Sequence, residues 1–436
     1  MPVRNLFVIA LAFIVSVMCY STASRNRYAN LFAEAVETIE SEALQQIPTR
    51  QLFNYAMDGM TSKLDGHSHY ITDEMYRIFN EELQQEFGGV GMYVDNDPEN
   101  GKLTVLAPIP GTPAFKAGVR AGDEIVQIEG KPTDDMNRSE AIELIRGPRG
   151  EPVNVVVARK GKEHSFDLVR EFIHEPSVHG DFRQADGAWI YKLKDYPNVG
   201  YIRLLQFGSK SADEMREALT VIGSEVDALI LDLRNNSGGV LNGAVEICDM
   251  FLEPSKAIVS TRGRENVVLM EYTAHEGHTF PGDKPIVILI NRESASASEI
   301  VAACLQDHQR AVLIGENSWG KGTVQHVIPI ECGKSALKLT TQSYWRPSGV
   351  NIDRYAQTAK ESGNWGVSPN ENMSLDLTEE EIFDNRRRRS LQDLRGLITP
   401  EELKDRDEDK LIETADKPLQ RAIKYLKSKL GNRVAA

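Results

Sequence analysis

Residues 285–325 read PIVILINRESASASEIVAACLQDHQRAVLIGENSWGKGTVQ, and their pattern predicts an α/β fold. The segment opens with an apolar run at 285–290 and contains a second run at 311–314. Short apolar runs rich in β-branched residues are typical of strands buried on both faces. A helical stretch lies between them, so the expected order is strand, small-residue turn, helix and strand.

Polar residues follow both predicted strands. Serines stand at 294, 296 and 298, and Lys321 lies between two glycines, with Gln325 four residues later. A serine is a weak nucleophile and needs a nearby base to take its proton. A lysine can be that base when it is neutral, which desolvation in apolar surroundings favours. The pattern therefore indicates a serine nucleophile with a lysine base, whose amine Gln325 could orient.

A second strand and turn precede this segment. Residues 228–239 read ALILDLRNNSGG, a buried strand that runs into a glycine turn. A strand at 199–205 and a helix at 211–223 come before it, and a helix at 241–252 follows. Chemistry in open α/β sheets lies at the carboxyl ends of the strands. The glycine turn and the serine cluster are therefore expected at one edge.

Together these motifs resemble the C-terminal processing peptidases, also called tail-specific proteases. In that family the nucleophile is the middle serine of an S-A-S-A-S-E run. The base is the lysine of a G-K-G-[ST]-V-Q run, 25 residues later. Ser296 and Lys321 stand at these positions, and the resemblance implies that Gln325 hydrogen-bonds the lysine. The outer serines, Ser294 and Ser298, are expected to be turn or capping residues.

The resemblance also implies an oxyanion hole. The family uses a glycine of a D-L-R-x-N-x-G-G turn, which is residues 232–239 here. Gly238 carries over as one N–H donor and Ala297, next to the nucleophile, as the other. This chain has Ser237 where the family commonly has proline. Ser237 also stands in an N-S-G-G run like that of trypsin-like PDZ proteases, but those carry the PDZ domain after the protease.

Residues 87–170 resemble a PDZ domain. The run Gly89, Val90, Gly91 and Met92 stands where a PDZ fold binds a peptide carboxylate. Successive N–H groups of such a turn form an anion nest, and the peptide adds as a strand to the sheet edge. Together with this domain, the resemblance to the C-terminal processing peptidases implies a ClpP/crotonase-like layered α/β core, a PDZ-like α+β domain and helical segments at both ends.

The expected domain layout follows from these assignments. Arg4 precedes a 15-residue, mainly apolar run from Leu6 to Tyr20, and small residues follow it, which indicates a signal peptide or an uncleaved membrane anchor. Either one exports the body to a periplasmic or other extracytoplasmic location. The layout is 1–24 signal or anchor, 25–86 N-terminal helical region, 87–170 PDZ domain, 181–370 peptidase domain and 371–436 charged helical tail.

The charge and the cysteine and histidine spacing argue against several classes of partner and site. The 436 residues carry a formal net charge of −14, which argues against nucleic-acid binding. Four cysteines show no C-x-x-C spacing, so neither a zinc nor a redox site is expected. His275 and His278 are spaced i, i+3 rather than the i, i+4 of a zinc-protease helix. We expect no metal and no cofactor.

The sequence thus predicts a serine endopeptidase that cleaves protein substrates near or from their C-terminus. Its PDZ domain would recognise exposed C-termini and gate the active site. Membrane contact is expected only through an N-terminal anchor. The sequence is compatible with either a monomer or an oligomer. Two alternatives on the same fold are a catalytically idle PDZ scaffold and a small-ligand-binding protein, and the intact Ser296 and Lys321 weigh against both.

Overall fold

The computed structural model describes residues 5, 9–17, 27–97, 100–134, 136–184, 186–275, 277, 279–394, 396–398 and 416–431. The chain divides into two compact units. One comprises residues 1–76 and 325–340, and the other comprises 77–324 and 341–436.

The first unit contains two N-terminal helices and a short β-ladder. Its elements are α2 (Arg27–Glu42), α3 (Thr49–Thr61) and β1 (His69–Ile71), with most of β20 (Thr323–Ile330) and the first part of β21 (Ser335–Trp345). Tyr70 of β1 is opposite Leu337 of β21 in an antiparallel pair. Residues 25–86, predicted as helical, therefore also contain a strand. It follows a turn in which Asp65 Oδ1 accepts hydrogen bonds from the N–H groups of His67 and Ser68.

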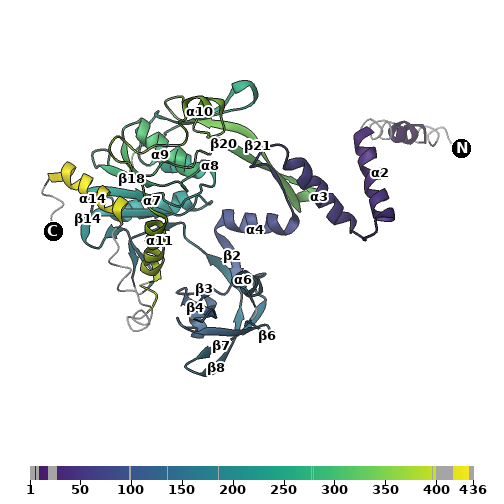
Figure 1. Ribbon diagram of the computed structural model, residues 1–436, viewed down its shortest axis with the longest axis horizontal. Coiled ribbons are helices and arrows are strands. Elements are labelled where there is room, and N and C mark those ends of the chain that lie inside the picture. Colours follow the sequence, from purple (N-terminus) through teal and green to yellow (C-terminus); the bar gives the residue numbers. More distant parts are fainter. Residues whose placement is uncertain are drawn as a thin grey trace. The chain divides into compact units, whose positions relative to one another are not determined.

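A mainly parallel sheet forms the centre of the second unit (Figure 1). Its strand order is β10-β14-β15-β18-β19, with β13 also paired to β14. The bounds are β10 Val178–His179, β13 Lys192–Leu193, β14 Tyr196–Leu204, β15 Ala228–Asp232, β18 Ile286–Ile290 and β19 Ala311–Gly315. The strands from β14 to β19 are parallel, which matches the predicted strands.

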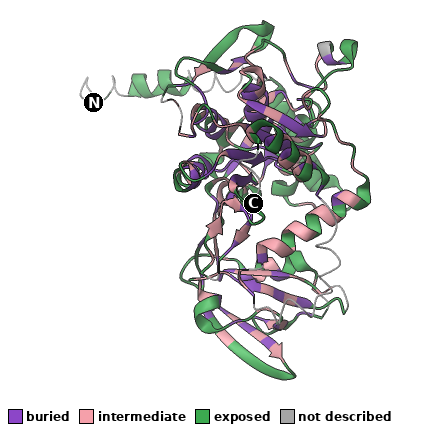
Figure 2. Cartoon of the chain, turned by 90° about the vertical axis from the view of Figure 1, so that its left-hand side faces the viewer, coloured by how far each residue is buried: buried purple, intermediate pink, exposed green. Residues whose placement is uncertain are grey.

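Helices cover both faces of this sheet, because successive strand residues point to opposite sides. One face packs on α7 (Ser211–Ile222), α8 (Leu241–Asp249) and α9 (Ala297–Asp307). The other face packs on α14 (Lys417–Leu430). Figure 2 shows the buried residues concentrated in these layers. The predicted layered α/β core is confirmed, and Cys248 and Cys304 are buried in it as small core residues.

Residues 92–169 form a separate small sheet of the PDZ type, with its own apolar core. The strand order is β3-β4-β5-β7-β8, with β6 beside β5. The elements are β3 Met92–Asn96, β4 Leu103–Pro108, α5 Pro113–Ala117, β5 Glu124–Ile128, β6 Lys131–Pro132, α6 Arg138–Ile145, β7 Pro152–Arg159 and β8 Lys162–Val169. Asn137 and Glu140 form a capping box that starts α6. Strands β2 (Glu86–Gly89) and β9 (Glu171–His174), on either side of this domain in the sequence, pair with each other in antiparallel fashion.

The structure also contains further helices and strands. They are α4 Asp73–Gln84, β11 Phe182–Arg183, β12 Trp189–Ile190, β16 Ala257–Arg262, β17 Val268–Thr273, α10 Gln357–Ser362 and α11 Glu379–Leu394. Helices α11 and α14, here called the C-terminal arm, come from the predicted charged tail. Among the described residues, no helix is long and apolar enough to cross a membrane.

Candidate active site

The serine cluster lies in the turn between β18 and α9, and its three serines have different environments. Ser294 and Ser298 are fully buried and donate hydrogen bonds to the carbonyl oxygens of Leu233 and Asn236, at 2.8 Å and 2.9 Å. These two hydrogen bonds attach the serine turn to the neighbouring turn at residues 232–239. Ser296 is partly exposed, and its φ of 55° and ψ of −114° are unusual for a residue with a side chain. Of the three, it is the serine that a substrate can reach.

Glu299 ties the backbone of Ser296 to that of Lys321. One carboxylate oxygen, Oε2, accepts the N–H of Ser296 at 2.8 Å and the N–H of Lys321 at 2.9 Å. The other oxygen accepts the N–H of Gly320 at 2.7 Å and the hydroxyl of Ser318 at 2.5 Å. Glu299 has no exposed surface, and burial raises its pKa although these four hydrogen bonds oppose the shift. All four groups act as donors to Glu299, which suits a carboxylate.

Tyr344 of β21 joins the same two residues from the carbonyl side. Its hydroxyl lies 3.1 Å from the carbonyl oxygen of Ser296 and also hydrogen-bonds the carbonyl oxygen of Lys321. Burial and the nearby Glu299 raise the pKa of Tyr344 well above its usual value, so the phenol stays a neutral donor. The backbones of residues 296 and 321 are thus clamped through their N–H groups by Glu299 and through their carbonyls by Tyr344.

The glycine turn at 232–239 lies against the serine cluster. The N–H of Ala295 donates to the carbonyl oxygen of Asn236 at 3.0 Å. Gly238 has a φ of +101°, and a Cβ at this position would lie 2.8 Å from the Cβ of Ser296. Only glycine fits so close to the serine with this backbone. The N–H of Gly238 donates to Oδ1 of Asn236 at 2.8 Å in this structure.

The other predicted site residues are placed as follows. Ala297 is the first residue of α9, where N–H groups have no partner within the helix. Lys321 is partly buried and follows the loop after β19. Gln325 lies in the first unit, where its Nε2 donates to the hydroxyl of Thr340 at 3.2 Å. Within the described residues, no group of three or more His, Cys, Asp or Glu side chains is placed to hold a metal ion.

The predicted carboxylate loop lines a groove of the small domain. The groove encloses about 230 Å³, and residues 89–92 are among those that line it. Ile142 and Ile145 of α6 and Val94 of β3 supply apolar walls. Strand β3 is at the edge of its sheet among the strands described, so an extended peptide could pair with it.

The sequence did not predict the roles of Glu299 and Tyr344. A signal for Glu299 was present, because Ser296 and Glu299 have the S-x-x-E spacing of a capping box. No local pattern marks Tyr344, which reaches Ser296 from a strand 48 residues away in the sequence.

Comparisons with known proteins identify the family. Residues 198–372 match peptidase family S41, and residues 104–159 match a PDZ domain. A carboxy-terminal-processing protease of Bartonella bacilliformis is 37% identical over 359 residues, covering 80% of this chain and 79% of that protein. A carboxyl-terminal-processing protease of Synechocystis sp. is 34% identical over 304 residues, covering 69% and 68%.

A solved structure named photosystem II D1 C-terminal processing protease is 27% identical and covers 79% of this chain and 92% of that one, with a TM-score of 0.44. The extent and identity of the sequence matches confirm the resemblance that the serine and lysine motifs indicated. The chain belongs to peptidase family S41 and is a serine peptidase that carries a PDZ domain.

Proposed function

We propose that Ser296 is the nucleophile of this peptidase and Lys321 its general base. Neutral Lys321 takes the proton of Ser296 as the serine oxygen attacks the peptide carbonyl, and then gives that proton to the leaving amine. Water hydrolyses the acyl-enzyme and restores both residues. Gln325 orients the lysine amine in this mechanism.

The observation that carries the proposal is the shared clamp on the two residues. Glu299 accepts both N–H groups, and Tyr344 reaches both carbonyls. Ser296 and Lys321 lie 25 residues apart in the sequence, yet the backbones of both are fixed to the same two buried side chains. Reacting groups gain most from being held in one geometry before the reaction, which supports the proposal.

The negative charge that develops on the substrate carbonyl oxygen during the attack requires hydrogen-bond donors. We assign this role to the N–H groups of Gly238 and Ala297, each worth roughly 3–4 kcal/mol of barrier in such sites. Because the N–H of Gly238 is bonded to Asn236 here, the substrate oxygen must share that N–H or replace the amide oxygen.

The substrates we propose are proteins with exposed or unfolded C-termini. The groove at residues 89–92 would take the terminal carboxylate, and the apolar walls would take the last side chain. Binding there would also gate access to Ser296. The names of the relatives, carboxy-terminal-processing proteases, support cleavage at the C-terminus of a protein.

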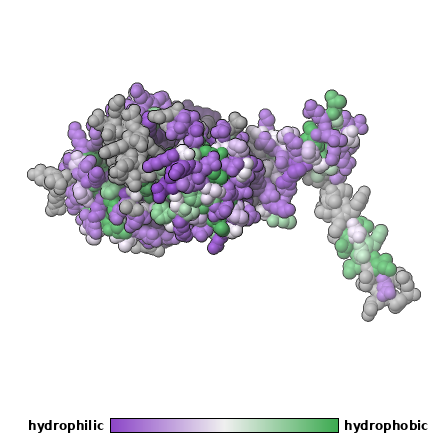
Figure 3. All heavy atoms as spheres, turned by 90° about the horizontal axis from the view of Figure 1, so that it is seen from below, coloured by the Kyte–Doolittle hydropathy of each residue, from purple (hydrophilic) through white to green (hydrophobic). Residues whose placement is uncertain are grey.

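We further propose that the body works outside the cytoplasm. Residues 9–17 are helical, and their large apolar side chains are exposed (Figure 3). Such a run suits a signal peptide or a retained anchor, and the mass of the mature protein would distinguish them. Residues 1–4, 6–8 and 18–24 of this predicted segment lie outside the described part of the chain. Self-association is left to measurement.

Cleavage of an unfolded protein tests the proposed residues. We expect Ser296→Ala and Lys321→Ala to lower the rate at least about 10³-fold. Ser237→Ala is a matched control, because this exposed serine lies in the adjacent turn and is predicted to have no chemical role. Wild-type cleavage by Ser296→Ala would overturn the assignment, and an inactive wild type that still binds tails would favour the scaffold alternative.

A further inference from the structure

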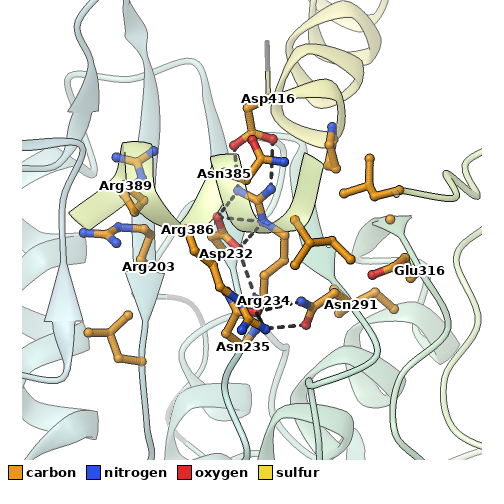
Figure 4. A pocket seen from close by; sticks show the side chains of 16 residues that line it. Arg203, Asp232, Arg234, Asn235, Asn291, Glu316, Asn385, Arg386, Arg389 and Asp416 are labelled. Atoms are coloured by element: carbon orange, nitrogen blue, oxygen red, sulfur yellow. Dashed lines mark hydrogen bonds and ion pairs between the residues drawn. The ribbon is translucent and has the colours of Figure 1, made fainter. Parts of the chain in front are cut away.

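A cavity of about 150 Å³ at the carboxyl edge of the parallel sheet has no part in the proposed chemistry (Figure 4). Asp232, Arg234 and Asn235, from the turn that contains Gly238, line it on one side. The C-terminal arm lines the other, through α11 and the start of α14. The arm therefore lies directly on the turn that holds the proposed oxyanion donor.

The main contact between them is a buried two-point ion pair. Arg234 donates from Nη1 to Oδ1 of Asp416 at 2.8 Å and from Nη2 to Oδ2 at 3.0 Å. The same guanidinium donates from Nε to Asp232 at 2.9 Å. Both aspartates are 5% exposed. A bidentate pair fixes the plane of the guanidinium as well as its position.

Arg234 is one of several anchors of this turn. Towards the serine cluster, the N–H of Asn235 donates to Oδ1 of Asn291 at 2.9 Å. Towards β14, Nδ2 of Asn236 donates to the carbonyl oxygen of Leu204 at 2.7 Å. Arg234 differs from these anchors, because it reaches outside the sheet to Asp416. Without Asp416, Arg234 loses the two hydrogen bonds that tie it to the start of α14, four residues before Gly238.

Helix α14 has a second attachment that does not involve Asp416. Ala422 and Leu426 are fully buried against Val287, Leu289 and Ile314 of the sheet. Removing the charge of Asp416 should therefore leave the helix docked. Its effect on the turn can then be measured in a folded protein.

We propose that Asp416 is a positioning residue of the peptidase: through Arg234 it holds the 232–239 turn so that the N–H of Gly238 meets the developing oxyanion. The C-terminal arm, predicted as a charged helical tail, is then required for the reaction. The inference rests on the proposed role of Gly238.

The test compares Asp416→Asn with Glu381→Gln in the full chain. Glu381 of α11 pairs with Lys417 at the same junction of the two helices, so its removal is a matched control. With a fluorogenic peptide, we expect Asp416→Asn to lower kcat at least about tenfold while KM stays within about twofold. Affinity for a peptide boronate, which forms a tetrahedral adduct with the serine, should fall in parallel. Glu381→Gln should change each value less than about twofold.

A purely structural role predicts a different result. Folded Asp416→Asn with wild-type kcat and boronate affinity would overturn the inference, even if its thermal unfolding temperature fell. If this variant does not fold, Arg234→Met/Asp416→Leu replaces the buried pair with apolar side chains, a change that is often neutral for stability. Wild-type kcat in that folded variant would equally overturn it. Cleavage that survives in Ser296→Ala would instead overturn the proposed nucleophile, so the two failures are distinguishable.

Discussion

Glu299 is the residue whose replacement tests the clamp most simply. In Glu299→Gln one carboxylate oxygen becomes an NH₂ group, which would face N–H donors of residues 296, 320 and 321 or the hydroxyl of Ser318. A buried donor without an acceptor costs about 1–3 kcal/mol. We expect the free energy of unfolding to fall by about that amount and kcat to fall at least about tenfold.

Urea unfolding and steady-state kinetics on the same preparation check both expectations. Glu293→Gln is the control, because Glu293 lies in the same turn but is partly exposed and pairs with Arg386 of the arm. Wild-type kcat in Glu299→Gln would show that the clamp does not position the reacting groups.

At the scale of elements, the groove between β3 and α6 should bind tails independently of the chemistry. Ile142 lines this groove, so Ile142→Ala removes apolar surface that a terminal side chain would cover. The loss is about 1–2 kcal/mol, which is roughly a 5- to 30-fold weaker Kd. Fluorescence anisotropy of a labelled peptide with an apolar last residue measures it in the Ser296→Ala background.

Val169→Ala is the matched control for this binding. Val169 is a 52% exposed apolar residue of the same domain, at the end of β8 and outside the groove. Equal peptide affinity in Ile142→Ala, Val169→Ala and the parent would mean that tails do not bind here.

For the whole molecule, the buried pair of Asp416 predicts a dependence of stability on acid. Burial alone would raise the pKa of Asp416, but Arg234 and Arg388 lower it to about 2, from an ordinary value of 3.8. A carboxyl with a depressed pKa stabilises the fold above its unfolded pKa and loses that contribution as the pH falls through its folded pKa. The contribution is therefore complete above about pH 4 and disappears towards about pH 2.

Denaturant titrations between these pH values compare the wild type with Asp416→Asn. The free energy of unfolding of the wild type should fall by up to about 2 kcal/mol more than that of the variant. If the free energies of unfolding of the two proteins fell equally with pH, the carboxylate of Asp416 would not be held by the two arginines.

Local patterns predicted most of the fold and part of the site. The strand expected at 285–290 is β18, Ile286–Ile290, because a buried apolar run leaves a clear signal. The serine turn follows from the same segment. Tyr344 and Asp416 could not be predicted, since each reaches its partner through the folded chain. Asp416 is 182 residues from Arg234, and no sequence pattern links the charged helical tail to the 232–239 turn.

The most direct test of the account is labelling with a fluorophosphonate, which reacts with an activated serine. After digestion, mass spectrometry locates the adduct. We predict one adduct, on the peptide that contains Ser296, and none in Lys321→Ala, where the base is missing. An adduct on Ser237, or labelling of Ser296 that is equally fast without Lys321, would contradict the proposed pair.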